Sequence, residues 1–95
     1  MKYKIVYSDE ALYKLSKIEL FVLFNFNKNV LDKFKIKLSQ EVNYLSQYPF
    51  SSKRLDDNYF KKVLTKHYSI LFMLSDFEII ILDFIISKSA NNFYY

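Results

Sequence analysis

The chain has 95 residues, with 14 Lys and Arg against 10 Asp and Glu, a net charge of +4, and neither cysteine nor glycine. Without cysteine, thiolate catalysis, disulfides and cysteine-ligated metal sites are excluded. Without glycine, the P-loop and the GxGxxG turn are excluded, because both need glycine where the backbone approaches a phosphate. This length predicts one domain over residues 1–95, and the start lacks the apolar segment of a signal peptide, so we expect a cytoplasmic protein.

The first predicted elements are a strand and a helix. Residues 3–7, YKIVY, are β-branched and aromatic and alternate in character, which predicts a strand. Ser8 before two acidic residues suits a helix N-cap, with carboxylates at the positive end of the helix dipole. An apolar stripe at three- and four-residue spacing predicts a helix to about residue 26. Its members are Ala11, Leu15, Ile18 and Val22.

A second helix is predicted after a short asparagine-containing connection. It ends before Pro49, because the residue before a proline disfavours the helical conformation. Two helices joined by a short loop predict an antiparallel helical hairpin. The apolar stripe of the second helix consists of Leu31, Phe34, Leu38, Val42 and Leu45.

The C-terminal half is predicted to be a loop followed by three strands. Residues 50–58 are loop-like, and 59–65, YFKKVLT, alternate weakly. Residues 68–86 are long and apolar enough for a membrane helix, but Asp76, Glu78 and Asp83 would each cost about 2.5–3.5 kcal/mol at the bilayer centre. We therefore predict a β-hairpin with these acids at or near its turn, and no membrane contact. The element order indicates an α+β fold, an antiparallel three-strand meander with the helical hairpin packed on one face.

This order, together with particular residues, resembles the RelE/ParE superfamily of bacterial toxins from type II toxin–antitoxin modules. YKIVYSDEALYKLSKI is similar to the family's first strand and helix start, and LSQYPF to its second-helix exit. The stretch from Lys53 to Ile85 resembles its three-strand meander, with Tyr68 and Phe72 in the family's aromatic pattern. The resemblance implies a β-α-α-β-β-β fold and a growth-inhibiting, plasmid-stabilising toxin relieved by a cognate antitoxin.

The resemblance leaves three activities open. ParE-like members poison DNA gyrase, whereas RelE-like members cut mRNA on the ribosome with basic side chains and an acid–base group. The third alternative is a catalytically inactive relative that only binds protein. The implied partners are the antitoxin and either gyrase or the ribosome with mRNA, in a homodimer or a heterotetramer with the antitoxin. No cofactor or metal is expected.

The resemblance also assigns candidate site residues. A nuclease would use Lys61, Lys62, His67 and the tail tyrosine Tyr94 as catalytic residues. Ser69, Met73 and Ser89 stand where RelE-like enzymes carry arginines or the Tyr-Arg pair of the third strand. Lysine supplies charge without a guanidinium fork, so we favour the ParE-like activity. The remaining candidate binding residues are Lys53, Arg54, Lys66 and Lys88.

Other interpretations of these residues stay open. Strand lysines are also typical of a solvated sheet edge, where they discourage aggregation. His67 is the only histidine and cannot form a multi-histidine metal site. Apolar surface around Phe21 and Phe24 suits an antitoxin or self-association groove. Residues 89–95 form a tail that packs on the sheet, frays or stacks on bases.

Overall fold

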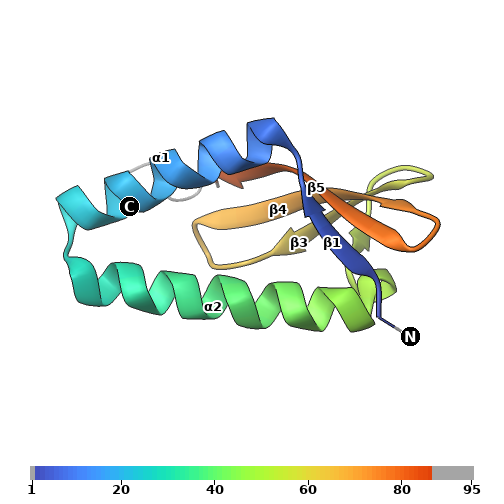
Figure 1. Ribbon diagram of the computed structural model, residues 1–95, viewed down its shortest axis with the longest axis horizontal. Coiled ribbons are helices and arrows are strands. Elements are labelled where there is room, and N and C mark those ends of the chain that lie inside the picture. The colour runs from blue at the N-terminus through green and yellow to red at the C-terminus, as the bar shows by residue number, and fades with distance from the viewer. Residues whose placement is uncertain (1, 87–95) are drawn as a thin grey trace.

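The computed structural model describes residues 2–86, which form a two-layer α+β domain (Figure 1). The strands make one five-stranded mixed sheet in the order β1-β5-β4-β3-β2, and both helices pack on one of its faces. The predicted fold class is therefore confirmed. The elements are β1 (Lys4–Tyr7), α1 (Asp9–Asn25), α2 (Lys28–Gln47), the 3-10 helix η1 (Pro49–Ser51), β2 (Lys53–Arg54), β3 (Tyr59–Val63), β4 (Tyr68–Ser75) and β5 (Glu78–Ile86).

The predicted meander is formed by β3, β4 and β5, which pair antiparallel in chain order. Two details differ from the prediction. The loop predicted at 50–58 contains the short strand β2, which pairs antiparallel with β3. β3 ends at Val63, before the predicted residue 65, because the amides of Leu64 and Thr65 both donate to the carbonyl of Tyr68 at 3.0 Å and close the β3–β4 connection.

Each helix starts at a residue whose side chain caps it. The Ser8 hydroxyl accepts a hydrogen bond from the Ala11 amide at 3.0 Å, as predicted, and Asn27 caps α2 in the same way. Ser8 also donates through its amide to Ile81 at 2.9 Å and through its hydroxyl to Leu82 at 3.1 Å. This residue therefore fixes the end of β1, the start of α1 and the middle of β5 relative to one another.

The acidic residues of the C-terminal hairpin do not all lie at its turn. Asp76 and Glu78 lie at the turn. Asp83 lies inside β5, so the prediction was wrong for this residue. A bulge after Ile81 shifts the register, so that Leu71 pairs with Asp83 while Phe72 pairs with Ile81. Strict alternation after Ile81 would put Asp83 into the core; the bulge directs it outward, where it bonds Lys14 at 3.0 Å.

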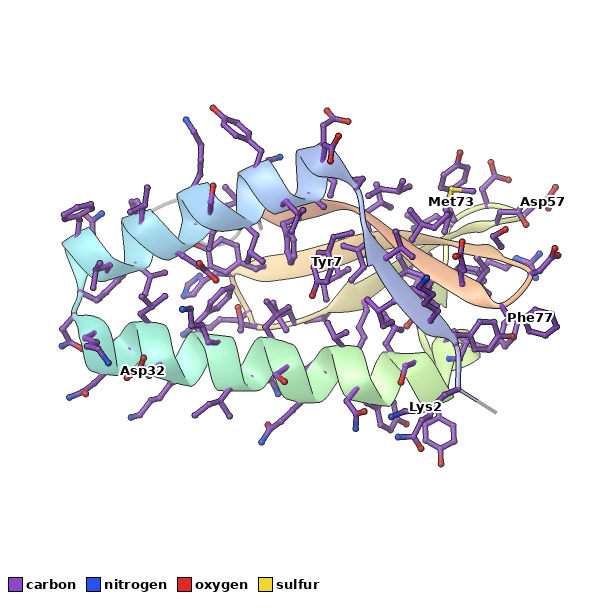
Figure 2. The ribbon with its side chains drawn as sticks, viewed as in Figure 1. Lys2, Tyr7, Asp32, Asp57, Met73 and Phe77 are labelled. Atoms are coloured by element: carbon purple, nitrogen blue, oxygen red, sulfur yellow. The ribbon has the colours of Figure 1, made fainter. Side chains whose placement is uncertain are left out.

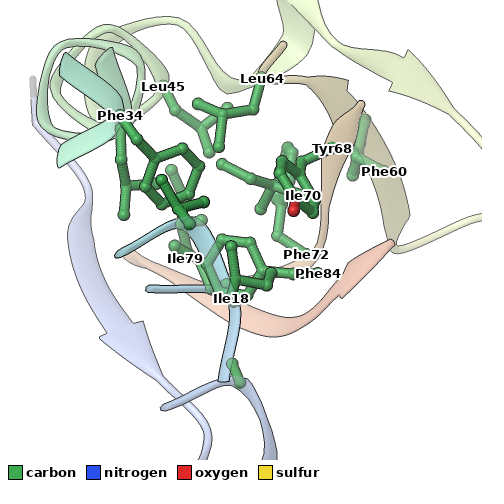
Figure 3. Packing of buried hydrophobic residues seen from close by; sticks show 14 residues of the cluster. Ile18, Phe34, Leu45, Phe60, Leu64, Tyr68, Ile70, Phe72, Ile79 and Phe84 are labelled. Atoms are coloured by element: carbon green, nitrogen blue, oxygen red, sulfur yellow. The ribbon is translucent and has the colours of Figure 1, made fainter. Parts of the chain in front are cut away.

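The hydrophobic core lies between the helices and the inner face of the sheet (Figure 3). Phe72 stacks on Phe60 with ring centroids 5.3 Å apart, and Tyr68 meets Phe34 edge to face at 5.7 Å. Tyr68 thus points into the core. Residues 68–86 are strands and a turn, and none of the helices within residues 2–86 is long and apolar enough to cross a membrane.

Candidate functional site

Lys61 and Lys62 lie on opposite faces of the sheet, because successive side chains of a strand alternate. Lys62 shares the inner face with the buried Phe60, and Lys61 shares the open face with Tyr59 and Val63. The two lysines predicted to act together in a nuclease are therefore separated by the thickness of the sheet.

Lys62 connects the sheet to α2. Its ammonium lies 3.0 Å from the Glu41 carboxylate and 5.1 Å from the centroid of the Tyr44 ring, and its side chain is only 15% exposed. Glu41 also bonds Lys37 at 3.0 Å. The hydrogen bonds from Lys37 and Lys62 lower the pKa of the Glu41 carboxyl below its ordinary value. Lys62 is thus occupied by structural contacts within the fold.

The open face of the sheet carries both apolar and charged rows of side chains; the row at the β4–β5 turn consists of Lys4, Glu78 and Ser75. Cross-strand partners share a face, so the register defines rows of side chains across the strands. Two rows are mostly apolar and consist of Val6, Ile80, Met73 and Tyr59, and of Ile85, Ser69 and Val63. The row between them consists of Asp83, Leu71, Lys61 and Lys53.

Lys61 and Lys53 are the predicted site residues that the structure brings together. They are direct partners in the β2–β3 ladder and project from the same face. Ser69 and Met73, where the resemblance expects cationic side chains, lie on this face too and leave the β4 part of it without charge. The open face therefore carries two mostly apolar rows and, between them at the β2–β3 side of the sheet, a pair of lysines.

Arg54 holds the β2–β3 connection. Its guanidinium donates to the carbonyls of Asp56 at 3.2 Å and Asp57 at 2.9 Å. The chain's one arginine thus has a structural function in the turn, and two of its donors are directed at the backbone rather than outward. Its predicted role in binding stays a prediction.

His67 and Lys66 lie in the β3–β4 connection. His67 lines an apolar cleft of 640 Å³ between this connection, the end of α1 and the first half of α2. Burial lowers the pKa of His67 below its ordinary value, and the charge of Lys66 lowers it further, so the imidazole is neutral at pH 7. His67 thus faces the helices, whereas Lys61 faces away from them.

Phe21 and Phe24 lie on α1. Phe21 borders an apolar groove of 430 Å³, together with Ile18, Tyr68 and Ile86. Phe24 is 79% exposed. The antitoxin contact predicted for both residues stays a prediction.

Tyr94, Lys88 and Ser89 lie outside the described residues, as does the tail at 89–95. Within residues 2–86, no three His, Cys, Asp or Glu side chains are grouped so that they could hold a metal ion.

The sequence did not reveal the role of Glu41 or Tyr44. The Lys37–Glu41 spacing of four residues could have indicated a helix ion pair, but nothing local to the chain indicates that Lys62 joins it from β3.

Similarity to known proteins is found in structure and not in sequence. No protein-family model matches the sequence, and no curated protein matches it significantly. Among solved structures, a chain of the chromosomal ParDE toxin–antitoxin system from P. aeruginosa superposes with a TM-score of 0.76 at 15% identity, covering 92% of this chain and 98% of that chain.

Two further structures are similar. The toxin–antitoxin complex RelBE2 from Mycobacterium tuberculosis gives a TM-score of 0.62 at 18% identity, covering 92% of this chain and 100% of that chain. The YoeB dimer from Staphylococcus aureus gives 0.60 at 12% identity, covering 87% and 94%. The chain therefore has the fold of the RelE/ParE toxins.

Proposed function

We propose that this protein is the toxin of a type II toxin–antitoxin module and that it acts in the ParE-like way, by docking on DNA gyrase. The observation that carries the choice of target is the open face of the sheet, on which two of the rows are mostly apolar. Apolar surface bordered by a few charges is what a protein partner recognises.

The same face is poorly suited to cutting RNA. Stabilising a scissile phosphate takes several converging cations, with an acid–base group within hydrogen-bond reach of the reacting atoms. Among residues 2–86 the strands offer the open face Lys53 and Lys61 on β2 and β3, and Lys4 beside Glu78 at the far edge on β1, while Lys62 is bonded to Glu41 on the other side. His67 lines a cleft against the helices. The observed placement supports a protein target over a phosphate target.

An antitoxin is the second partner in this proposal. The structural neighbours from the ParDE system and the RelBE2 complex support a toxin that is neutralised by a bound protein. The groove beside Phe21 and the exposed Phe24 give α1 a surface for such a contact.

Induced expression in a bacterial host is the first test. Growth arrest is expected, and harmless expression of folded protein would contradict the toxin assignment and leave the inactive protein-binding relative. In arrested cells, plasmid DNA should show the topological signature of gyrase poisoning, and purified protein should inhibit supercoiling. Ribosome-dependent mRNA cuts in primer extension, with supercoiling unaffected, would instead identify a RelE-like nuclease.

A matched pair of variants locates the target surface. Met73→Asp puts a charge in the middle of the open face and should abolish arrest. Ile36→Asp places the same charge on α2, at a side chain that is 57% exposed, and should leave arrest intact. Circular dichroism spectra like that of the parent chain are the control that both variants fold. Equal toxicity of the two would contradict docking through the open face.

A further inference from the structure

The cleft that His67 lines lies between the two helices and the β3–β4 connection, on the side of the α1–α2 turn (Figure 1). Its volume of 640 Å³ is within the range of about 300–1,000 Å³ that small-molecule sites have. Tyr7 is directed from β1 into the other half of the space between the helices (Figure 2). The cleft is lined by Val22 and Phe26 at the end of α1, by Val30, Lys33, Phe34 and Lys37 in the first half of α2, and by Thr65, His67 and Tyr68.

Hydrogen bonds within the β3–β4 connection fix one wall of the cleft. The Thr65 hydroxyl accepts from the amides of His67 at 3.1 Å and Tyr68 at 3.2 Å. The Tyr68 ring meets the Phe34 ring of α2 edge to face, with the centroids 5.7 Å apart. Contacts within the protein therefore hold these lining residues in place. A site that is already ordered binds a ligand without the cost of ordering its side chains.

The inner part of the cleft is buried, and its rim is exposed apolar surface. Val22 and Phe34 are buried, whereas Phe26 is 50% and Val30 38% exposed. Apolar side chains at a rim lose contact with water when an apolar group enters the cleft, and each methylene group that is buried raises affinity about fourfold. The lining therefore favours a ligand with an apolar tail.

The charged side chains of the lining are basic. Lys33 and Lys37 lie one turn apart on α2, and the lining has no Asp or Glu among the described residues. Lys37 bonds Glu41 at 3.0 Å, but Glu41 also bonds Lys62 at 3.0 Å, so these three side chains keep one net positive charge. Lys33 forms no ion pair with any residue of the range 2–86. The charge at this cleft is therefore complementary to an anion.

His67 and Thr65 add hydrogen-bonding groups to the lining. A neutral imidazole has one N–H donor, and a hydroxyl that accepts two hydrogen bonds can still donate its own proton. A carboxylate can accept from such donors. A phosphate group would carry more charge into a lining that is mainly apolar, at a larger cost in desolvation. A carboxylate is therefore the anion that fits this cleft.

We propose that this cleft is a binding site for a small carboxylic acid with an apolar tail, bound in its ionised form. The carboxylate lies at Lys33, and the tail lies against Phe26, Val30 and Phe34. Small-molecule sites are commonly of this kind, mostly apolar with a few polar groups that fix the orientation of the ligand. The inference goes beyond the proposed function, because it concerns a small molecule and depends on neither gyrase nor an antitoxin.

The test is an NMR titration of the purified, isotope-labelled protein with octanoate, below the concentration at which octanoate forms micelles. We expect saturable chemical-shift changes at the amides of Val30, Lys33 and Thr65 and on the His67 ring. Octylammonium has the same tail with the opposite charge and should bind about tenfold more weakly. Hexanoate has two methylene groups fewer and should bind about fifteenfold more weakly.

A second acid distinguishes two sources of the same chemistry. 3-Phenylpropanoate carries an aryl tail on the same head group as octanoate. Saturable binding of either acid at the cleft supports the proposal, and the ratio of the two affinities shows whether the cleft prefers an alkyl or an aryl tail.

Two pairs of variants locate the carboxylate and the tail. Lys33→Gln should weaken octanoate binding about fivefold, whereas Lys35→Gln removes the same charge from an exposed position of α2 outside the cleft and should leave binding unchanged. Val30→Trp fills the rim and should abolish binding, whereas Ile36→Trp, at an exposed side chain of α2 outside the cleft, should not. Circular dichroism shows whether the variants keep the fold of the parent chain.

Three outcomes would overturn the proposal. The first is the absence of saturable shifts with both acids. The second is octylammonium binding as tightly as octanoate, or equal effects of Lys33→Gln and Lys35→Gln, since either would show that the cleft does not recognise the carboxylate. The third is a change of the cleft amides with protein concentration in the absence of ligand, which would place a second copy of the chain there. Because only small-molecule binding is measured, the result is independent of growth arrest.

Discussion

The two faces of the sheet use neighbouring residues of the same strand for different purposes. On β3, Lys62 is directed to the helices and bonds Glu41, while Lys61 is directed to the open face beside Lys53. On β4, Phe72 is fully buried, while its neighbour Met73 lies on the open face. The inner face is a packed core with bonded cations at its border, and the open face has two mostly apolar rows with a pair of lysines between them.

Strand phase, and not residue type, therefore decides which face of the sheet each side chain occupies. A shift of one residue moves a whole strand segment to the other face. β5 contains such a shift at its bulge, which keeps Phe84 in the core and Asp83 outside it. A role can therefore be assigned to a candidate catalytic residue in a strand only when the face of the sheet that it occupies is known.

The largest expected effect is at the core side of β4. Phe72→Ala removes a fully buried ring that stacks on Phe60 and should lower the free energy of unfolding by about 3–5 kcal/mol. Met73→Ala, one residue away on the open face, should cost less than about 1 kcal/mol. Urea denaturation followed by circular dichroism measures both. Similar losses for the two variants would contradict the division into a packed and an open face.

The two lysines of β3 allow the same comparison of the two faces on a second strand. Lys62→Ala removes a charged hydrogen bond and stem packing and should cost about 1–3 kcal/mol. Lys61→Ala should stay within about 0.5 kcal/mol of the parent chain. Lys62→Met keeps the stem and removes the charge, so it divides the loss between packing and ion pairing. A lower denaturation midpoint for Lys61→Ala than for Lys62→Ala would show that the faces assigned to the two lysines are wrong.

Most of the fold could be predicted because it depends on local patterns. The two helical stripes place Ala11, Ile18, Val22 and Leu38 in the core as expected, and Ser8 is the N-cap. The strand β2 was missed because it is two residues long and is held by the Arg54 side chain. The bulge was missed because an extra strand residue has no signature in composition; it is fixed by the contacts of Ser8 with β5.

The candidate site was less predictable because it depends on contacts distant in sequence. The Lys62–Glu41 pair joins residues that lie in different elements, and no periodicity connects them. The pairing of Lys53 with Lys61 depends on β2, which was expected to be loop. The position of β1 at the edge of the sheet depends on its parallel pairing with β5, a partner at the other end of the chain.

The Glu41 ion pairs predict a pH dependence. Hydrogen bonds from Lys37 and Lys62 hold the pKa of this carboxyl in the folded state below its ordinary 4.5. The unfolded chain therefore binds more protons at low pH, and the contribution is complete above about pH 4.5 and lost as the pH falls through the folded-state pKa. In urea titrations, the stability advantage of the parent over Glu41→Gln should shrink below pH 4.5. An advantage that is constant with pH would contradict the ion pairs.

The smallest expected effect is at His67, in the connection between the two strands that define the faces. Burial, and then the charge of Lys66, lower its pKa below the ordinary 6.5. Because the unfolded chain is protonated first, stability from this group is complete above about pH 6.5 and is lost as the pH falls towards the folded-state pKa. NMR titration of the imidazole should give a midpoint below 6.5, and Lys66→Ala should raise it only in part, since burial is the larger cause. A midpoint at or above 6.5 would indicate that His67 is exposed to solvent and does not line the cleft against α1 and α2.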